Sequence, residues 1–272
     1  MKPVMLDHHK PGLLLWLRSA LFLLGMGVST LIAVPIALIL LVVPFALRFR
    51  LVANWARFNL WWLGVSCRIK ADISGLENII DQPAIIMCKH QSAWETLMIQ
   101  LLFPPQVWIL KRELLHIPIY GWGLAAMKPI AIDRSLGVRS LKQIVRQGLE
   151  RLHAGLWVVV FPEGTRLAPG VRQKYHPGGA MLAEKSGCPV LPIAHNAGYL
   201  WPRNSFLKRP GVIRMVIGPP IPTQGKKATQ IIRETEDWIE ATVASLPAPT
   251  CDTPGGGLQI RPLNQPASRP TP

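Results

Sequence analysis

A run of 29 residues without charge, from 19 to 47, constrains the fold of this chain more than any other feature. As one continuous helix it would be about 43 Å long, whereas the hydrocarbon core of a bilayer is about 30 Å thick. The run therefore suits one tilted membrane span and is too short for two complete spans. It also exceeds the apolar region of a cleaved signal peptide, which is about 7–15 residues long.

The composition of this run leaves a second arrangement open. Pro35 and Pro44, together with Gly25 and Gly27, also permit a bent or re-entrant hairpin. The flanks on either side are similarly basic, so the bias of Lys and Arg that orients most spans gives no direction here. A hairpin would place both basic flanks on the cytoplasmic face. The sequence favours the span and the hairpin equally.

The charge of the chain indicates an anionic partner. There are 30 Lys and Arg against 15 Asp and Glu, a formal net charge of +15. Such an excess fits a nucleic acid or an anionic membrane surface. The mean hydropathy of +0.25 is high for a soluble nucleic-acid binder, and no nucleic-acid-binding motif is present. We therefore expect membrane lipid, and no nucleic acid, as a partner. The Trp-rich stretch at 55–70 fits equally a helix in the headgroup region and a helix packed on the domain.

Beyond residue 66 the hydrophobic pattern changes to short runs that alternate with helix-like stretches. This alternation predicts an α/β domain whose mixed, largely parallel sheet is flanked by helices. It follows an N-terminal membrane-embedded helical segment at 1–65 and occupies 66–246. We expect the Pro- and Gly-rich tail at 247–272 to be disordered. The predicted strands lie at 84–88, 107–110, 129–132, 157–161, 189–194 and 212–218, and the helices at 92–102, 137–154, 178–186 and 226–246.

The strand predicted at 84–88 leads into residues that can carry chemistry. His90 follows it, and Ser92 to Glu95 matches a capping box, with Ser92 as N-cap and Glu95 at the third helical position. His90 in the loop can therefore meet Glu95 in the first turn of a helix. A carboxylate that fixes the imidazole tautomer would leave the other ring nitrogen free as a general base. On spacing alone, a capping glutamate beside a loop histidine without a catalytic role is the simpler interpretation.

A second group of residues, FPEGTR at 161–166, lies at the end of the strand predicted at 157–161. A glycine there lets the backbone approach a ligand, and arginine can bind phosphate through two parallel hydrogen bonds. Because the carboxyl ends of parallel strands meet at one edge of a sheet, basic residues at other strand ends can converge on the same anion. Those basic residues are Lys111, Arg112 and Arg134.

Four sequence blocks occur in order between about residues 85 and 198. They are H-x4-E at 90–95, LKRELLHIPIYGWGL at 110–124 followed by IDR at 132–134, FPEGTR at 161–166, and VLPIAHNAG at 190–198 around Pro192. Their order and spacing resemble the glycerolipid acyltransferase family, in particular the 1-acyl-sn-glycerol-3-phosphate acyltransferases. This chain departs from the usual pattern at Glu95, where the family usually has Asp, and at Lys89, where Asn is common.

The resemblance implies a role for each motif. His90 would deprotonate the acceptor hydroxyl, which attacks a thioester carbonyl, while Glu95 would orient His90 and stabilise its protonated form. Neither a metal nor a cofactor is needed, because the thioester is already activated. The implied phosphate-binding residues are Lys111, Arg112, Glu163, Gly164, Thr165 and Arg166, and those that position the acyl group or acceptor are Arg134 and Pro192.

The resemblance also implies substrates and a location. The acceptor would be lysophosphatidate, the donor acyl-CoA or acyl-carrier protein, and the product phosphatidate. The enzyme would sit in the inner membrane with its catalytic domain on the cytoplasmic face. A different lysolipid acceptor, or a thioesterase or other hydrolase, is the alternative, although the G-x-S-x-G motif of α/β-hydrolases is absent. A non-catalytic membrane-binding protein would not account for the ordered blocks.

Overall fold

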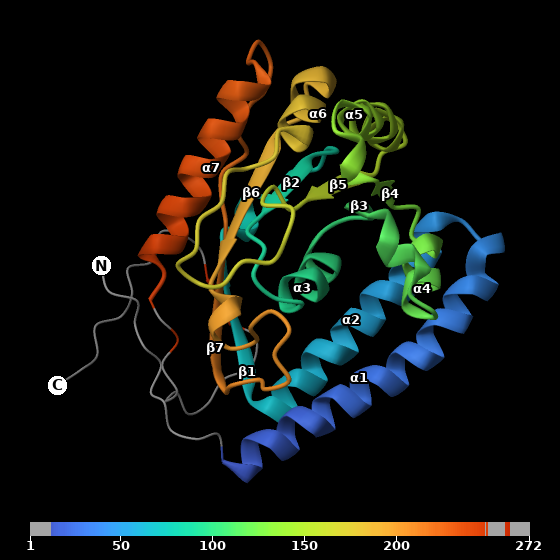
Figure 1. Ribbon diagram of the computed structural model, residues 1–272, viewed down its shortest axis with the longest axis vertical. Coiled ribbons are helices and arrows are strands. Elements are labelled where there is room, and N and C mark those ends of the chain that lie inside the picture. Colours follow the sequence, from blue (N-terminus) through green and yellow to red (C-terminus); the bar gives the residue numbers. More distant parts are fainter. Residues whose placement is uncertain (1–11, 248, 250–258, 262–272) are drawn as a thin grey trace.

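In the computed structural model, residues 12–247, 249 and 259–261 are described. A single sheet forms the centre of the molecule (Figure 1). Its strands are β1 (Ile69–Ser74), β2 (Ile85–Cys88), β3 (Gln106–Lys111), β4 (Ile130–Ile132), β5 (Trp157–Val160), β6 (Val190–His195), β7 (Gly211–Ile217) and β8 (Gln259–Arg261).

The strand order across the sheet is β4-β3-β5-β2-β6-β7-β1-β8. Every neighbouring pair is parallel except β6 and β7, which run antiparallel. The predicted mixed, largely parallel sheet is therefore confirmed. β2 lies in the middle between β5 and β6, and all three are buried along their whole length, which explains why their sequences are apolar except for His195 at the end of β6.

Helices cover both faces of this sheet. They are α1 (Leu13–Ile39), α2 (Phe45–Cys67), α3 (Trp94–Leu102), α4 (Tyr120–Ala126), α5 (Val138–His153), α6 (Gly178–Ser186) and α7 (Ala228–Ser245). Successive side chains of a strand point to opposite faces. Ile86 and Cys88 of β2 accordingly pack with α1, α2 and α3, and Ile85 and Met87 pack with α5, α6 and α7. The sheet is thus the middle of three layers.

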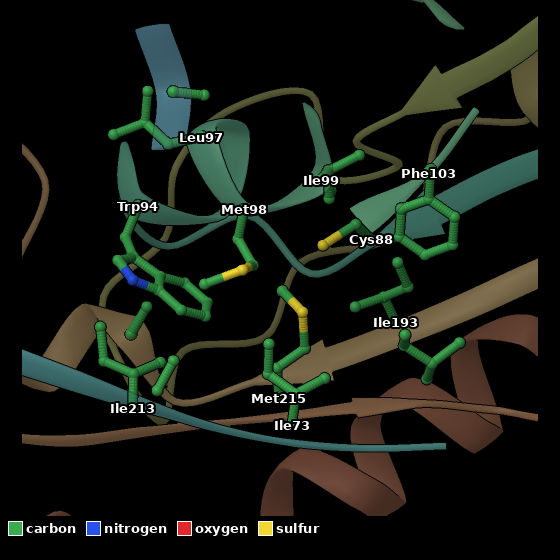
Figure 2. Packing of buried hydrophobic residues seen from close by; sticks show 14 of the residues in the cluster. Ile73, Cys88, Trp94, Leu97, Met98, Ile99, Phe103, Ile193, Ile213 and Met215 are labelled. Atoms are coloured by element: carbon green, nitrogen blue, oxygen red, sulfur yellow. The ribbon is translucent and has the colours of Figure 1, made fainter. Parts of the chain in front are cut away.

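The core on the α3 side holds the first turns of α3 firmly against the sheet. Figure 2 shows Trp94 and Met98 of α3 beside Ile73 of β1 and Met215 of β7, which are paired in register. Trp94 is 1% exposed and Met98 2% exposed. Burial on this scale contributes about 1.5–3 kcal/mol for each large apolar side chain. It fixes the helix that begins just after His90.

Most of the apolar run forms one long helix, and a turn near its end leads into a second helix. α1 and α2 form a helical hairpin whose turn includes a short 3₁₀ helix at Leu40–Val42 and then Pro44 (Figure 1). Arg48 is buried, and its Nη1 donates to the carbonyl of Leu40 at 3.2 Å, which satisfies a carbonyl at the end of α1. Gly25, Gly27 and Pro35 all lie inside the unbroken helix α1, so the choice between a membrane span and a re-entrant hairpin stays a prediction.

This hairpin has one face on the domain and one face exposed. Phe22 and Leu63 belong to the same buried cluster as the sheet, and Trp62 donates to the carbonyl of Leu21 at 3.2 Å. Gly25 lies against the Trp62 ring, where a Cβ would collide. Yet Leu13–Val42 is long and apolar enough to cross a membrane, and only 11% of its most apolar stretch is buried inside the protein. One face of α2 packs on the domain, as one interpretation of 55–70 predicts, while Trp61 on the other face is exposed, and a place in the headgroup region stays a prediction.

The structure also corrects the sequence prediction in places. Strand β1 and helix α4 were not predicted, and β8 places 259–261 in the sheet beside β1 although the tail was expected to be disordered. The rest of that tail beyond 249, and residues 1–11 of the predicted N-terminal segment, lie outside the described residues. The six predicted strands and four predicted helices are present, and no end is shifted by more than two residues.

Candidate active site

The predicted site residues gather at one edge of the sheet. His90 follows β2, the segment 163–166 follows β5, Lys111 ends β3, and Arg134 comes just after β4. These four strands are neighbours in the order β4-β3-β5-β2 and all are parallel. Their carboxyl ends therefore open on the same edge, which is where ligands bind in sheets of this kind.

His90 and Glu95 are in direct contact. The Nδ1 of His90 lies 2.8 Å from Oε1 of Glu95, so a proton on Nδ1 is held by the carboxylate. The His90 ring stacks on Phe161, with ring centroids 3.8 Å apart and planes inclined by 12°. The side chain is 14% exposed. With Nδ1 protonated, Nε2 carries the free lone pair.

The surroundings of His90 and Glu95 favour a neutral imidazole and an ionised carboxylate. Burial lowers the pKa of His90, as do Arg166 and Arg134, while Glu95 opposes the shift. Burial alone would raise the pKa of Glu95, but His195, His90 and the Ser92 N–H together hold it below the ordinary value. At neutral pH the imidazole is therefore neutral and the carboxylate is ionised.

The loop between β2 and α3 wraps around the Glu95 carboxylate. Oε1 accepts the backbone N–H groups of Gln91 at 3.0 Å and Ser92 at 2.9 Å. The predicted capping box is therefore only half right: α3 begins at Trp94 with Ala93 as N-cap, and Ser92 Oγ accepts the N–H of Trp94 at 3.2 Å in place of that of Glu95. The carboxylate is drawn towards the imidazole and the loop N–H groups, so the helix starts later than predicted.

His195, at the end of β6, supports the same loop from inside the protein. Its Nδ1 accepts the N–H of Ala197 at 3.2 Å, so Nε2 carries the proton and donates to the carbonyl of Lys89 at 2.8 Å. Burial lowers the pKa of His195, which agrees with this neutral form. Pro192, around which the fourth block is centred, lies within β6 opposite Met87. His195 in the same block is the residue that reaches the His90 loop.

The FPEGTR turn is joined to the His90 loop on its inner side. Glu163 is fully buried, and its Oε1 accepts the His90 N–H at 3.4 Å and lies 3.1 Å from Nζ of Lys89. Burial raises the pKa of Glu163 to about 7, against the opposing effect of Lys89. The N–H of Leu167 donates to the His90 carbonyl at 2.8 Å. Glu163 was expected at the substrate phosphate, and the structure places its carboxylate beneath the loop instead.

Gly164 is required by the shape of this turn. Its φ is +70°, a conformation that favours glycine, and a Cβ there would lie 2.9 Å from the His176 ring. Nη1 of Arg134 donates to the Gly164 carbonyl. Thr165, the next residue, is half-buried in the same turn. The turn therefore brings Arg134, from the end of β4, close to the residues that follow β5.

The other predicted cations differ in the hydrogen bonds and ion pairs that they form. Arg166 is half-buried, and its Nε is buried without a hydrogen-bond partner among the described residues. Arg112 forms an ion pair with Asp133 at 2.9 Å, and Lys111 is exposed at the end of β3. Arg134 and Arg166 both act on the His90 pKa, so the structure places these two positive charges near the imidazole.

This arrangement can perform one kind of chemistry well. A neutral imidazole with a carboxylate on one nitrogen can take a proton from a substrate hydroxyl. The charges of Arg134 and Arg166 favour an anionic substrate beside that base. Lys89 and His195, which hold the loop from below, were not predicted, although both stand inside or next to the sequence blocks.

Comparisons with known proteins find relatives in both sequence and fold. The model of the family described as Acyltransferase matches residues 70–196. A 1-acyl-sn-glycerol-3-phosphate acyltransferase of Pseudomonas aeruginosa is 41% identical over 261 residues, covering 94% of this chain and 96% of that protein. A chloroplastic protein of the same name from Brassica napus is 30% identical over 231 residues, covering 82% of this chain and 66% of that protein. The crystal structure of the 1-acyl-sn-glycerophosphate (LPA) acyltransferase PlsC from Thermotoga maritima shares the fold, with a TM-score of 0.71 and 22% identity over 85% of this chain and 95% of that one.

Proposed function

The chain belongs to the 1-acyl-sn-glycerol-3-phosphate acyltransferase family, and from this premise we propose that it acylates the sn-2 hydroxyl of 1-acyl-glycerol 3-phosphate to give phosphatidate. It is an O-acyltransferase. The observation that carries the proposal is the 2.8 Å contact between His90 and Glu95 at the sheet edge where Arg134 and Arg166 also lie. The acyl donor in this proposal is a thioester, either acyl-CoA or acyl-carrier protein.

In the proposed reaction, Nε2 of His90 takes the proton from the acceptor hydroxyl as its oxygen attacks the thioester carbonyl. A new C–O bond forms, the C–S bond breaks, and the proton passes from His90 to the departing thiolate. Glu95 stabilises the transient imidazolium, since its carboxylate already holds the Nδ1 proton. General-base assistance of this kind is worth about 10²–10⁴-fold in rate.

The proposed phosphate site uses Arg166 and Lys111, which are only part of the predicted phosphate-binding set, together with Arg134. Arg166 has a buried Nε without a partner among the residues described, and Arg134 reaches the same turn. Lys111 at the exposed end of β3 can add charge, whereas Arg112 is engaged by Asp133. In this proposal Glu163 acts indirectly, because a buried carboxylate under the His90 loop would repel a phosphate.

Replacing Arg166 with alanine should raise the KM for lysophosphatidate by about 10–100-fold and change the KM for the donor little. Hydrogen bonds to a charged group contribute about 1.5–3 kcal/mol, which corresponds to this range. The measurement is initial rates at varied acceptor with saturating donor, and then the reverse. Arg233→Ala is the matched control, because Arg233 on α7 is 85% exposed. An unchanged acceptor KM in Arg166→Ala would count against a phosphate at this residue.

The activity itself is tested with purified protein in detergent, labelled acyl-CoA and lysophosphatidate, following product mass and free thiol together. Phosphatidate and thiol in equal amounts support the proposal. If no product forms, the assay is repeated with acyl-carrier protein and then with other lysolipids. A different acylated product would reassign the acceptor, and thiol release without any acylated product would indicate a thioesterase.

We also propose that the α1–α2 hairpin holds the enzyme on the cytoplasmic face of the inner membrane, where the acceptor resides. Exposed apolar side chains recur along one stripe of α1, namely Leu21, Leu24, Val28 and Leu31. Exposing a contiguous apolar stripe to water is unfavourable, whereas the same side chains can insert among lipid chains. The net charge of +15 would favour an anionic leaflet.

Replacing Leu24 and Leu31 with glutamate should lower binding to anionic lipid vesicles at least tenfold, because two charges would enter the lipid-facing stripe. Vesicle flotation of detergent-depleted protein measures this. The matched control is Val138→Glu with Val171→Glu, which adds the same charge at exposed apolar positions in other parts of the fold. Equal flotation of the two double variants would show that the stripe does not contact lipid.

A further inference from the structure

The residue directly before His90 carries a positive charge into the interior of the protein. Lys89 is 1% exposed. Its Nζ lies 2.6 Å from Oε1 of Glu240 and 3.1 Å from Oε1 of Glu163. A buried ammonium is tolerated only when it is paired, so this cluster has a narrow range of acceptable arrangements.

Glu240 brings a distant part of the chain into this cluster. It lies on α7, 151 residues from Lys89 in sequence. Its carboxylate is held on two further sides, because the hydroxyl of Tyr175 donates to Oε1 at 3.0 Å and Nε of Arg172 donates to Oε2 at 3.1 Å. Figure 1 shows the long loop between β5 and α6, which contains both residues, passing beside α7. Helix α7, this loop and the His90 loop therefore meet at one carboxylate.

Hydrogen bonds of the Lys89 backbone fix the chain directly before His90. Its N–H donates to the carbonyl of Ile193 at 3.0 Å, and its own carbonyl accepts the His195 proton at 2.8 Å. Glu163, the second partner of the ammonium, also accepts the N–H of His90. A movement of the Lys89 side chain would therefore act on the peptide group between Lys89 and His90, whose carbonyl and N–H are both hydrogen-bonded.

We propose that Lys89 and Glu240 are positioning residues, and that α7 sets the place of His90 through their buried ion pair. The inference rests on the proposed role of His90 in acyl transfer. Neither residue contacts substrate: the ammonium and carboxylate face the interior, beneath the loop. An ion pair that only joined α7 to the domain would affect stability and leave the environment of His90 unchanged.

The decisive variant is Glu240→Gln, which keeps the volume and an oxygen acceptor but removes the charge. We expect kcat to fall at least tenfold at a temperature well below the Tm, with the KM of each substrate changed less than twofold. Asp237→Asn, one turn earlier on α7 and 74% exposed, is the matched control and should keep the wild-type kcat. A milder variant, Tyr175→Phe, removes one hydrogen bond from Glu240 and should lower kcat about threefold, which keeps the test open if Glu240→Gln does not fold.

A second measurement needs no turnover. In ligand-free protein labelled at the histidine Cε1, the His90 resonance is assigned by its loss in His90→Gln. We expect Glu240→Gln to move this resonance and Asp237→Asn to leave it in place. Wild type that makes no phosphatidate while the resonance still moves would overturn the proposed function and keep the positioning pair. Wild type that is active, with Glu240→Gln unchanged in kcat and resonance at a lower Tm, would overturn the positioning pair alone.

Discussion

Replacing His90 with alanine should lower kcat/KM for phosphatidate formation by about a thousandfold or more and leave the protein folded. The general base contributes about 10²–10⁴-fold in reactions of this type, and the stabilised imidazolium is lost with it. The fold should survive because the Glu95 carboxylate keeps its hydrogen bonds from the N–H groups of Gln91 and Ser92. The measurement is product formation beside circular dichroism and thermal unfolding of both proteins.

A matched histidine serves as the control for this variant. His153 is exposed at the end of α5, so His153→Ala removes an imidazole without touching the site. It should retain wild-type activity. If His90→Ala kept more than a tenth of the wild-type kcat/KM, another group would have to be the base, and the proposed mechanism would fail even with the family assignment intact.

The parts of the site that could be predicted from the sequence are those formed by neighbouring residues. His90 and Glu95 are five positions apart, and a strand followed by a helix leaves few ways for the intervening loop to run. The turn at 161–166 is equally local, and Gly164 adopts the left-handed conformation that a glycine in such a turn suggests. Parallel strands then bring these local motifs to one edge, which the alternating pattern had already indicated.

The parts that could not be predicted depend on distant partners. The family resemblance implied a phosphate role for Glu163, but its direction is decided by Lys89, 74 positions earlier in the chain. Glu240 appears in the sequence as one of several acidic residues on an amphipathic helix. Only the packing of α7 distinguishes it from Asp237, which is exposed. Buried ion pairs of this type leave no periodic signal in the sequence.

The arrangement of the N-terminal apolar run could not be predicted for a different reason. Its composition predicted a membrane segment but fitted a span and a hairpin equally, because proline and glycine permit a bend without requiring one. The contacts that pack α1 against α2 and the domain are tertiary: Phe22 and Leu63 enter the core of the catalytic domain, and Trp62 packs where Gly25 leaves room. Such contacts pair residues about 40 positions apart.

Replacing Glu95 with glutamine should lower kcat by about 10²–10³-fold with little change in either KM. The amide keeps the shape of the side chain but cannot stabilise the imidazolium that forms when His90 takes the proton. Its NH₂ group would also face donors, since Oε2 now accepts the Ser92 N–H at 3.1 Å and lies 3.8 Å from Nε2 of His195. The measurement is the rate of phosphatidate formation across pH 5–9, beside thermal unfolding.

The direction in which the pH profile shifts in Glu95→Gln also tests the role of Glu95. Glu95 raises the pKa of His90 against the effect of burial, so removing its charge should lower that pKa. Because the neutral imidazole is the active form, the acid limb of kcat/KM should move to lower pH in Glu95→Gln. Glu95→Asp keeps the charge but withdraws it by about 1.5 Å, one C–C bond, so we expect intermediate activity and an acid limb near that of wild type. An acid limb that moved to higher pH in Glu95→Gln, or a kcat within threefold of wild type, would show that Glu95 serves the loop and not the base.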